Sequence, residues 1–131
     1  YINSNGGSVY DGLAIKDIIH NLPCKVNTKG VGMCASMGAY LLSCGTGTRK
    51  ATENCRIMIH SVSTGHVGNY HDLEVGFEET KYVQDKMISD MHKFTKGKST
   101  LELITDVCKR DFYMSPETAV EMGIIDLVIN N

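Results

Sequence analysis

The sequence predicts an α/β fold in which short strands alternate with helices and parallel strands are joined by helical crossovers. Two observations support this prediction. Apolar residues recur at helical spacing in segments such as 9–21, whereas short runs such as RIMIH at 56–60 have the length and apolar content of strands. Glycine, proline and asparagine separate the two kinds of segment. A chain of 131 residues can bury the core of one domain, but not of two.

The first part of the chain is predicted to form two strand–helix pairs. Residues 1–4 have the character of a strand end, and the NGGS sequence at 5–8 that of a tight turn. A helix is expected over 9–21. A second strand is expected over 25–32 and a second helix over 33–43, and because this helix is apolar nearly all round, it should be buried.

The middle of the chain is predicted to contain one unusually long helix. The third strand, over 56–60, is followed by a polar stretch at 61–69 and then by a helix over about 72–96. This helix would be about 37 Å long at ~1.5 Å per residue, which is too long for so small a domain to cover. It should therefore project from the body or pack against another subunit.

Cap signals define the end of the chain. A short helix is expected over 101–109. The sequence Ser115-Pro116-Glu117 is typical of a helix start, with a serine cap and proline in the first turn. That helix should end at Gly123, and a last strand should occupy 124–129.

Composition excludes several classes of function. The apolar share of 42% and the charged share of 21% are those of an ordinary globular domain. The net charge of −2 and the scattered basic residues do not favour binding to nucleic acid or to an anionic membrane. No apolar run has the length of a membrane span, and no signal peptide is visible. Because the chain opens at Tyr1 inside a strand-like segment, we expect it to be a fragment.

The cysteines and histidines indicate neither disulfides nor a metal site. Five cysteines contain no C-x-x-C pair, and we expect them to be small buried residues in a reducing compartment; they are Cys24, Cys34, Cys44, Cys55 and Cys108. Of the histidines, only His66 and His71 form a loose pair, which we interpret as loop surface. No metal is expected.

Two nucleotide-binding motifs are matched only in part. The GVGMCA sequence at 30–35 has the spacing of a dinucleotide fingerprint, but Glu53 precedes the next strand instead of closing it. The GKST sequence at 97–100 resembles the end of a phosphate-binding loop. However, His92 stands where that loop requires glycine.

Ser36 is the strongest candidate for chemistry, because it lies among small residues at the predicted start of a buried helix. His60 ends a strand that should lie beside the strand that precedes Ser36 in the chain, so the two side chains can meet at one sheet edge. The glycine turn at 5–8 ends another strand there and could offer backbone N–H groups to an oxyanion. Spacing alone leaves open which acid would orient the histidine; the candidates are Asp106, Asp111 and Asp126.

Four blocks resemble one family in order and in spacing: YINSNGGS, GMCASMGAYLL, RIMIH and KRDFYMSPETAVEMGIID. They are similar to the Clp protease proteolytic subunit, and the similarity runs from residue 1 to about 129. The resemblance implies a ClpP/crotonase-type fold, a single peptidase domain over 1–131 without the family's N-terminal portion, and a serine endopeptidase. It also implies two stacked heptameric rings, a tetradecamer, around a chamber that an ATP-dependent AAA+ unfoldase of the ClpX, ClpA or ClpC type supplies with unfolded protein.

The resemblance assigns roles to particular residues. Ser36 matches the nucleophile, His60 the general base and Asp111 the acid that orients the histidine. The backbone N–H groups of Gly7 and Met37 match the oxyanion donors. The stretch 63–70 matches the strand beside which substrate pairs its backbone, for which we name Ser63, Thr64, Gly65, Val67 and Gly68. The segment about 72–96 matches the handle helix by which the rings interlock.

This chain departs from the family pattern at several positions. The usual Gln-Pro after the histidine is Ser61-Val62 here, which is expected to reshape the cleft. Lys109 replaces an acidic residue that precedes Arg110 in relatives and helps to pair the rings. Some docking positions for the unfoldase are polar here, which suggests a divergent contact or a ring shared with related Clp subunits; these positions are Lys29, Lys50 and Thr52.

The resemblance also sets the remaining expectations. No cofactor is expected, since ATP is used by the partner unfoldase. The compartment should be intracellular and reducing: a bacterial cytoplasm, a mitochondrial matrix or a plastid stroma. The alternatives are a non-catalytic or divergent subunit of a mixed Clp ring and a crotonase-type enzyme acting on acyl-CoA. The complete Ser36, His60 and Asp111 set argues against both, because inactive relatives lose members of it and crotonases use no serine nucleophile.

Overall fold

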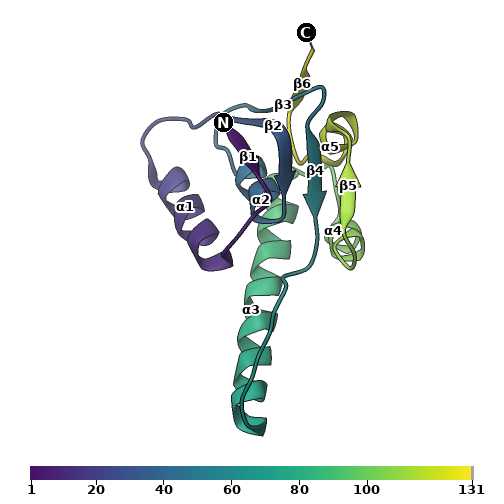
Figure 1. Ribbon diagram of the computed structural model, residues 1–131. Helices are drawn as coiled ribbons and strands as arrows, with labels where there is room; N and C mark the ends of the chain where they lie inside the picture. The colour runs from purple at the N-terminus through teal and green to yellow at the C-terminus, as the bar shows by residue number, and fades with distance from the viewer. Residues whose placement is uncertain (131) are drawn as a thin grey trace.

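The computed structural model describes residues 1–130 (Figure 1). These residues form a six-stranded sheet with helices packed around it. The elements in chain order are β1 (Ile2–Ser4), α1 (Val9–Asn21), β2 (Thr28–Ala35), α2 (Met37–Ser43), β3 (Arg49–Thr52), β4 (Arg56–Ile59), α3 (Tyr70–Phe94), α4 (Leu101–Val107), β5 (Phe112–Met114), α5 (Pro116–Met122) and β6 (Leu127–Ile129).

The longest strand, β2, organises the sheet. Its residue Gly30 pairs with both Ile2 of β1 and Ala51 of β3, so these two strands flank it on opposite sides. Further along, Cys34 pairs with β1 and with Ile57 of β4. Thus β3 and β4 share one side of β2, and the order is β5-β4-β2-β3-β6 with β1 on the other side. These pairings of β2, and that of β3 with β6, are parallel, as expected for helical crossovers.

The predicted bounds of α1 and the predicted cap of α5 are confirmed. Ser8, which was predicted only as part of a tight turn, caps α1 by accepting from the Asp11 N–H. Ser115 caps α5 by accepting from the Thr118 N–H, with Pro116 in the first turn. That helix ends at Gly123, whose φ of 83° lies in the left-handed region that glycine adopts without strain.

The long helix α3 projects from the body, as predicted (Figure 1). It begins two residues before the expected start because Asn69 and Asp72 form a capping box. Its second half packs on the core through Val83, Ile88 and Met91. The first half carries apolar side chains that stay mostly exposed within residues 1–130, and these include Val75, Phe77 and Tyr82.

The core is formed by the sheet, α2 and residues of α3, α4 and α5, and charged groups are buried at its edge. Arg49 is only 2% exposed. Its guanidinium donates to both carboxylate oxygens of Asp126, at 2.7 and 3.1 Å, and to the Ser43 and Phe94 carbonyls. The hydrogen bond from Arg49 lowers the pKa of Asp126 to about 2. The pair joins α2, β3, the end of α3 and the segment leading into β6, so it ties the C-terminal strand to the body.

Several element predictions were wrong. The last strand, expected over 124–129, covers only Leu127–Ile129, and the helix expected over 101–109 ends at Val107. The strand expected over 25–32 runs over Thr28–Ala35, and the helix expected from residue 33 begins at Met37. An apolar run such as GMCA suits a buried strand or a buried helix equally well, and pairing with β4 makes it a strand. The short strands β3 and β5 were not predicted, and β5 pairs antiparallel with β4 instead of parallel.

No helix within residues 1–130 combines the length and the hydropathy needed to cross a membrane.

Candidate active site

Ser36 occupies a sharp turn between β2 and α2. Its φ of 57° and ψ of −120° are strained for a residue with a side chain. Its N–H donates to the Met58 carbonyl at 2.8 Å, which fixes the turn against the end of β4. Although Ser36 stands at the N-cap position, its hydroxyl makes no cap hydrogen bond. A strained strand-to-helix turn that holds a hydroxyl clear of the backbone is typical of a nucleophilic serine.

The small residues around Ser36 are required by close backbone contacts. A Cβ on Gly6 would lie 2.8 Å from the Ser36 Cβ and 2.9 Å from the Ala35 carbonyl oxygen. A Cβ on Gly38 would lie 2.8 Å from the Ser4 carbonyl oxygen. The glycine turn after β1 and the start of α2 therefore touch each other on both sides of the serine.

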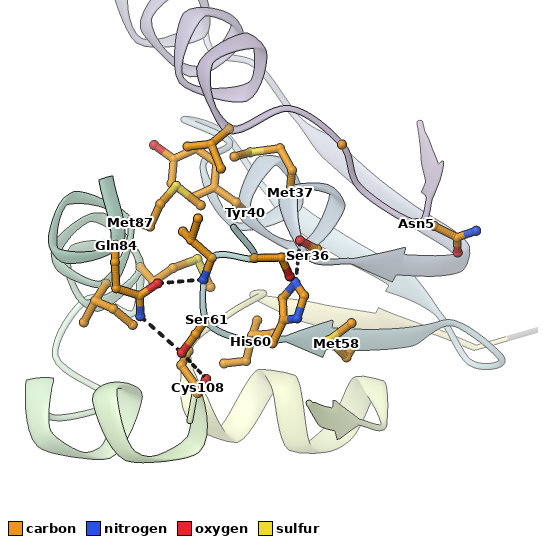
Figure 2. Close-up of a pocket in the computed structure, with 17 residues that line it drawn as sticks. Asn5, Ser36, Met37, Tyr40, Met58, His60, Ser61, Gln84, Met87 and Cys108 are labelled. Atoms are coloured by element: carbon orange, nitrogen blue, oxygen red, sulfur yellow. Dashed lines mark hydrogen bonds between the residues drawn. The ribbon is translucent and has the colours of Figure 1, made fainter. Parts of the chain in front are cut away.

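His60 directly follows β4, and strand register brings it to Ser36. Because Ala35 pairs with Met58 in the parallel β2–β4 ladder, the residues after each strand emerge at the same sheet edge. The His60 Nε2 atom lies 2.8 Å from Ser36 Oγ (Figure 2). The imidazole is partly buried, with 24% of its side chain exposed.

Asp111 reaches the other nitrogen of the same ring. Its Oδ1 atom lies 3.2 Å from His60 Nδ1. The antiparallel register explains this contact, since Ile59 pairs with Phe112 and the next pair outward is His60 and Asp111. The other two acids left open by the sequence are engaged elsewhere: Asp106 pairs with Lys109, and Asp126 with Arg49.

A cleft of about 260 Å³ opens beside the serine and the histidine. Its lining is mostly apolar, with a few polar groups near the mouth. The apolar members come from α1, α2, β4, α3 and the loop after β4, and they include Val9, Tyr40, Met58, Val62, Met87, Ile88 and Met91 (Figure 2). Such a cleft fits an apolar side chain beside the hydroxyl.

The two predicted oxyanion donors flank the serine. Gly7 and Met37 both line the cleft. A Cβ on Gly7 would meet nothing within 4 Å, so this residue faces open space. Met37 is the first residue of α2, where a backbone N–H has no acceptor inside the helix. Its side chain is held against Gly12 of α1, which leaves no room there for a larger residue.

The predicted substrate strand is not a strand within the described chain. Residues 61–67 have no assigned secondary structure, and Tyr70 already belongs to α3. The reason is that no neighbouring strand of this chain lies beside them, and the residues from Ser63 to Gly68 are exposed. Instead, His66 anchors the stretch on α3 through its ring nitrogen, 3.0 Å from the Thr80 hydroxyl.

The two residues predicted to contact a second ring, Lys109 and Arg110, are exposed. Lys109 lies 3.4 Å from Asp106 one turn earlier, a surface ion pair of small energy. Among the residues proposed for an unfoldase contact, the Lys29 ammonium lies over the Tyr1 ring, 4.9 Å from its centroid.

The remaining sequence motifs are not brought together as sites. The GVGMCA run lies inside β2 and not at a strand-to-helix turn, and GKST lies between α3 and α4. His66 and His71 have separate contacts, with Thr80 and with the Tyr70 ring. Within residues 1–130 no three His, Cys, Asp or Glu side chains are grouped as a metal would require.

Four of the five cysteines are buried, as predicted, whereas Cys24 is exposed. All five are free thiols. Burial raises the pKa of Cys34 to about 12 and that of Cys44 and Cys108 to about 11, so these thiols stay protonated.

Of the polar residues that hold the loop after His60, Gln84 was not predicted, and Ser61 was predicted only to reshape the cleft. Ser61 donates to the Cys108 carbonyl at 2.7 Å, and Gln84 of α3 accepts from the Val62 N–H at 2.7 Å. One signal was present: Gln84 lies at helical spacing from Met87, Ile88 and Met91, so it is a polar residue on the apolar face of α3.

Comparison with known proteins identifies the family of the chain. A family model described as "Clp protease" matches residues 1–131. The chain is 45% identical to the "ATP-dependent Clp protease proteolytic subunit 1" of Prochlorococcus marinus subsp. pastoris and 43% identical to the "ATP-dependent Clp protease proteolytic subunit 2" of Parasynechococcus marenigrum. Each match covers 99% of this chain and 66% of the relative. The proteolytic subunit of Deinococcus radiodurans is 45% identical, with 99% of this chain and 63% of that protein covered.

The chain thus spans slightly less than two thirds of the length of these curated relatives. The family model covers all of it, including the serine turn, the histidine that follows β4 and the acid that precedes β5. The chain belongs to the Clp protease family.

Proposed function

We propose that the full protein is a serine endopeptidase, the proteolytic subunit of an ATP-dependent Clp protease. One observation carries the proposal: Ser36 Oγ lies 2.8 Å from His60 Nε2, while Asp111 Oδ1 lies 3.2 Å from His60 Nδ1. This arrangement of hydroxyl, imidazole and carboxylate is the one that activates a serine. It also disfavours a non-catalytic subunit, since all three members are present and aligned.

The first half of the reaction is acylation of the serine. Asp111 accepts from the Nδ1–H of His60, which leaves Nε2 unprotonated and directed at the hydroxyl. As Ser36 Oγ attacks the peptide carbonyl carbon, Nε2 takes the hydroxyl proton. The C–N bond then breaks, and the imidazolium returns that proton to the leaving amine. The acyl group remains on Ser36 as an ester.

Water completes the reaction by the same route. Nε2 takes a proton from water as its oxygen attacks the ester carbonyl, and the proton passes to Ser36 Oγ when the acyl group leaves. The carbonyl oxygen carries negative charge in both halves. The backbone N–H groups of Gly7 and Met37 are the proposed donors to it, supported by their positions on either side of Ser36 in the cleft.

The proposed substrate is an unfolded polypeptide. The cleft is lined chiefly by apolar side chains, which favours an apolar residue next to the cleaved bond. The exposed stretch from Ser63 to Gly68 has unpaired, extended backbone that can pair with a peptide by strand addition. Only a polypeptide without folded structure can present its backbone in this way.

The proposed assembly is a tetradecamer of two heptameric rings with an AAA+ unfoldase as partner. Support comes from the exposed apolar half of α3, which needs a neighbouring subunit to cover Val75, Phe77 and Tyr82. ATP would act in the unfoldase and not in this chain. The free cysteines suit a reducing compartment inside a cell.

Peptide hydrolysis by the full-length protein tests the proposal. The wild type should hydrolyse a fluorogenic peptide with an apolar residue before the reporter group, and Ser36→Ala should reduce the rate at least about 10³-fold. The two proteins should sediment alike, because the Ser36 hydroxyl is hydrogen-bonded to His60 of the same chain. A Ser36→Ala protein that keeps most of the wild-type rate would show that another residue is the nucleophile.

A further inference from the structure

The segment that follows the catalytic histidine is held by side chains and not by strand pairing. Ser61 Oγ donates to the Cys108 carbonyl at 2.7 Å. Gln84 Nε2 donates to the same Ser61 hydroxyl at 3.3 Å, and Gln84 Oε1 accepts from the Val62 N–H at 2.7 Å. Figure 2 shows these three hydrogen bonds meeting below the cleft, next to His60.

These hydrogen bonds join the two segments that carry the histidine and its acid. Ser61 is adjacent to His60, and Cys108 lies at the C-cap of α4, three residues before Asp111. The β4–β5 ladder aligns the two segments only as far as the pair Ile59 and Phe112. On the far side of His60, the Ser61–Cys108 hydrogen bond provides the second attachment.

The His60–Asp111 contact needs such an attachment. Asp111 precedes β5 and exposes 58% of its side chain, so packing does little to fix its orientation. Its carboxylate lies 3.2 Å from Nδ1, at the long end of the hydrogen-bond range. A small movement of either segment would therefore break the contact.

We call the hydrogen bonds among Ser61, Val62, Gln84 and Cys108 the junction, and Gln84 connects this junction to α3. It lies on the helix face that also carries Met87, Ile88 and Met91, where an apolar residue would be expected. Because Val62 is not a proline, its partly buried N–H requires an acceptor, and Gln84 provides it. The helix that projects from the body is thereby attached to the residue next to the histidine.

We propose that Ser61 and Gln84 are positioning residues for catalysis, which hold His60 and Asp111 in register and fix both to α3. Neither side chain touches the reacting atoms. Both residues line the cleft, but their polar groups are engaged by Cys108, Val62 and each other. Their main effect is on the orientation of the imidazole, so their loss should lower kcat more than substrate affinity. This inference rests on the proposed peptidase function.

A double-mutant cycle in the full-length protein tests the inference. Ser61→Ala should lower kcat about tenfold and leave KM within about twofold, since small displacements of a catalytic group are costly. In an Asp111→Asn background the same change should cost less than about twofold, because the contact it supports is already lost. Equal losses in the two backgrounds, or a loss in KM alone, would overturn the inference.

Two further variants serve as a rescue and as a control. Ser61→Thr keeps a hydroxyl and should recover most of kcat. Thr105→Ala also removes a hydroxyl that donates to a backbone carbonyl at 2.7 Å, but this bond lies within α4 and joins no catalytic segment. It should leave kcat within about twofold. A comparable loss of kcat in Thr105→Ala would mean that general destabilisation, and not positioning, explains the Ser61 effect.

A Gln84→Leu variant, alone and combined with Ser61→Ala, tests whether the two side chains of the junction act together. Gln84→Leu should lower kcat in the same direction as Ser61→Ala, and the double variant should lose no more than the larger single loss. Fully multiplicative losses would contradict a shared junction.

A crystal structure of Ser61→Ala separates failure of this inference from failure of the proposed function. The inference predicts that Nδ1 and Oδ1 move apart beyond hydrogen-bond distance, whether or not the wild type hydrolyses peptides. Widening of this distance in a protein without peptidase activity would refute the proposed function but support the junction. An unchanged distance in an active enzyme would refute the junction alone.

Discussion

Replacement of Asp126 by asparagine should destabilise the fold markedly, because it leaves Arg49 buried without a countercharge. The hydrogen bond from Arg49 lowers the pKa of Asp126 from 3.8 to about 2, a difference worth about 2 kcal/mol. The carboxylate is 30% exposed, so water reduces this contribution to about 1–2 kcal/mol. Removing one partner from a buried ion pair costs a further penalty, and we expect a total loss of about 2–4 kcal/mol.

The pH dependence of this loss has a definite sign. Since the pKa of Asp126 in the folded protein lies below its ordinary value, the stabilisation is complete at neutral pH. It is lost as the pH falls from about 4 toward 2. The difference in stability between wild type and Asp126→Asn should therefore shrink over that interval.

Urea denaturation at one fixed protomer concentration measures the effect, because subunit association adds to the apparent stability. Lys96→Gln is the matched control. It removes an exposed partner that lies 3.8 Å from the same carboxylate and should cost less than about 1 kcal/mol. An Asp126→Asn protein within about 0.5 kcal/mol of wild type, or no different from Lys96→Gln, would refute the role given to the buried pair.

Three other predictions concern the serine turn, the thiols and the rings. Gly6→Ala should slow the reaction of Ser36 with a fluorophosphonate, because the new Cβ would lie 2.9 Å from the Ala35 carbonyl oxygen. Gly97→Ala should not slow it, because Gly97 has a similar positive φ but open space around it. Of the five cysteines, a thiol reagent should label only Cys24 in the native protein, as measured by intact mass. Rapid labelling of a second one would contradict the burial of the other four thiols. In the proposed tetradecamer, association of the two rings should be weaker, or should depend differently on salt, with Lys109 than in Lys109→Asp. Identical salt profiles of the two proteins in sedimentation would discard that idea.

Local signals in the sequence predicted much of the fold. Apolar residues at helical spacing were enough to predict the bounds of α1. Ser115 and the left-handed Gly123 act within one turn of α5, so the bounds of that helix could be predicted closely. The strand β2 could not, because its last residues are strand only by virtue of pairing with β4, which follows 20 residues later. The three-residue strand β5 likewise depends on a distant partner.

The candidate site shows the same division. Ser36 and His60 follow strands that parallel pairing places side by side, and this could be anticipated from strand ends alone. The choice of Asp111 over Asp106 and Asp126 could not be made from spacing and came only from the family resemblance, because it depends on the antiparallel β4–β5 register. Gln84 was missed, and Ser61 was predicted only to reshape the cleft, because their partner atoms belong largely to the backbone of other segments.

Whether His60 activates Ser36 is tested directly by reaction of the full-length assembled protein with a fluorophosphonate probe. We expect one adduct per chain by intact mass, located at Ser36 by peptide mapping and absent from Ser36→Ala. An assembled protein that forms no adduct, or one labelled equally in Ser36→Ala, would contradict this activation.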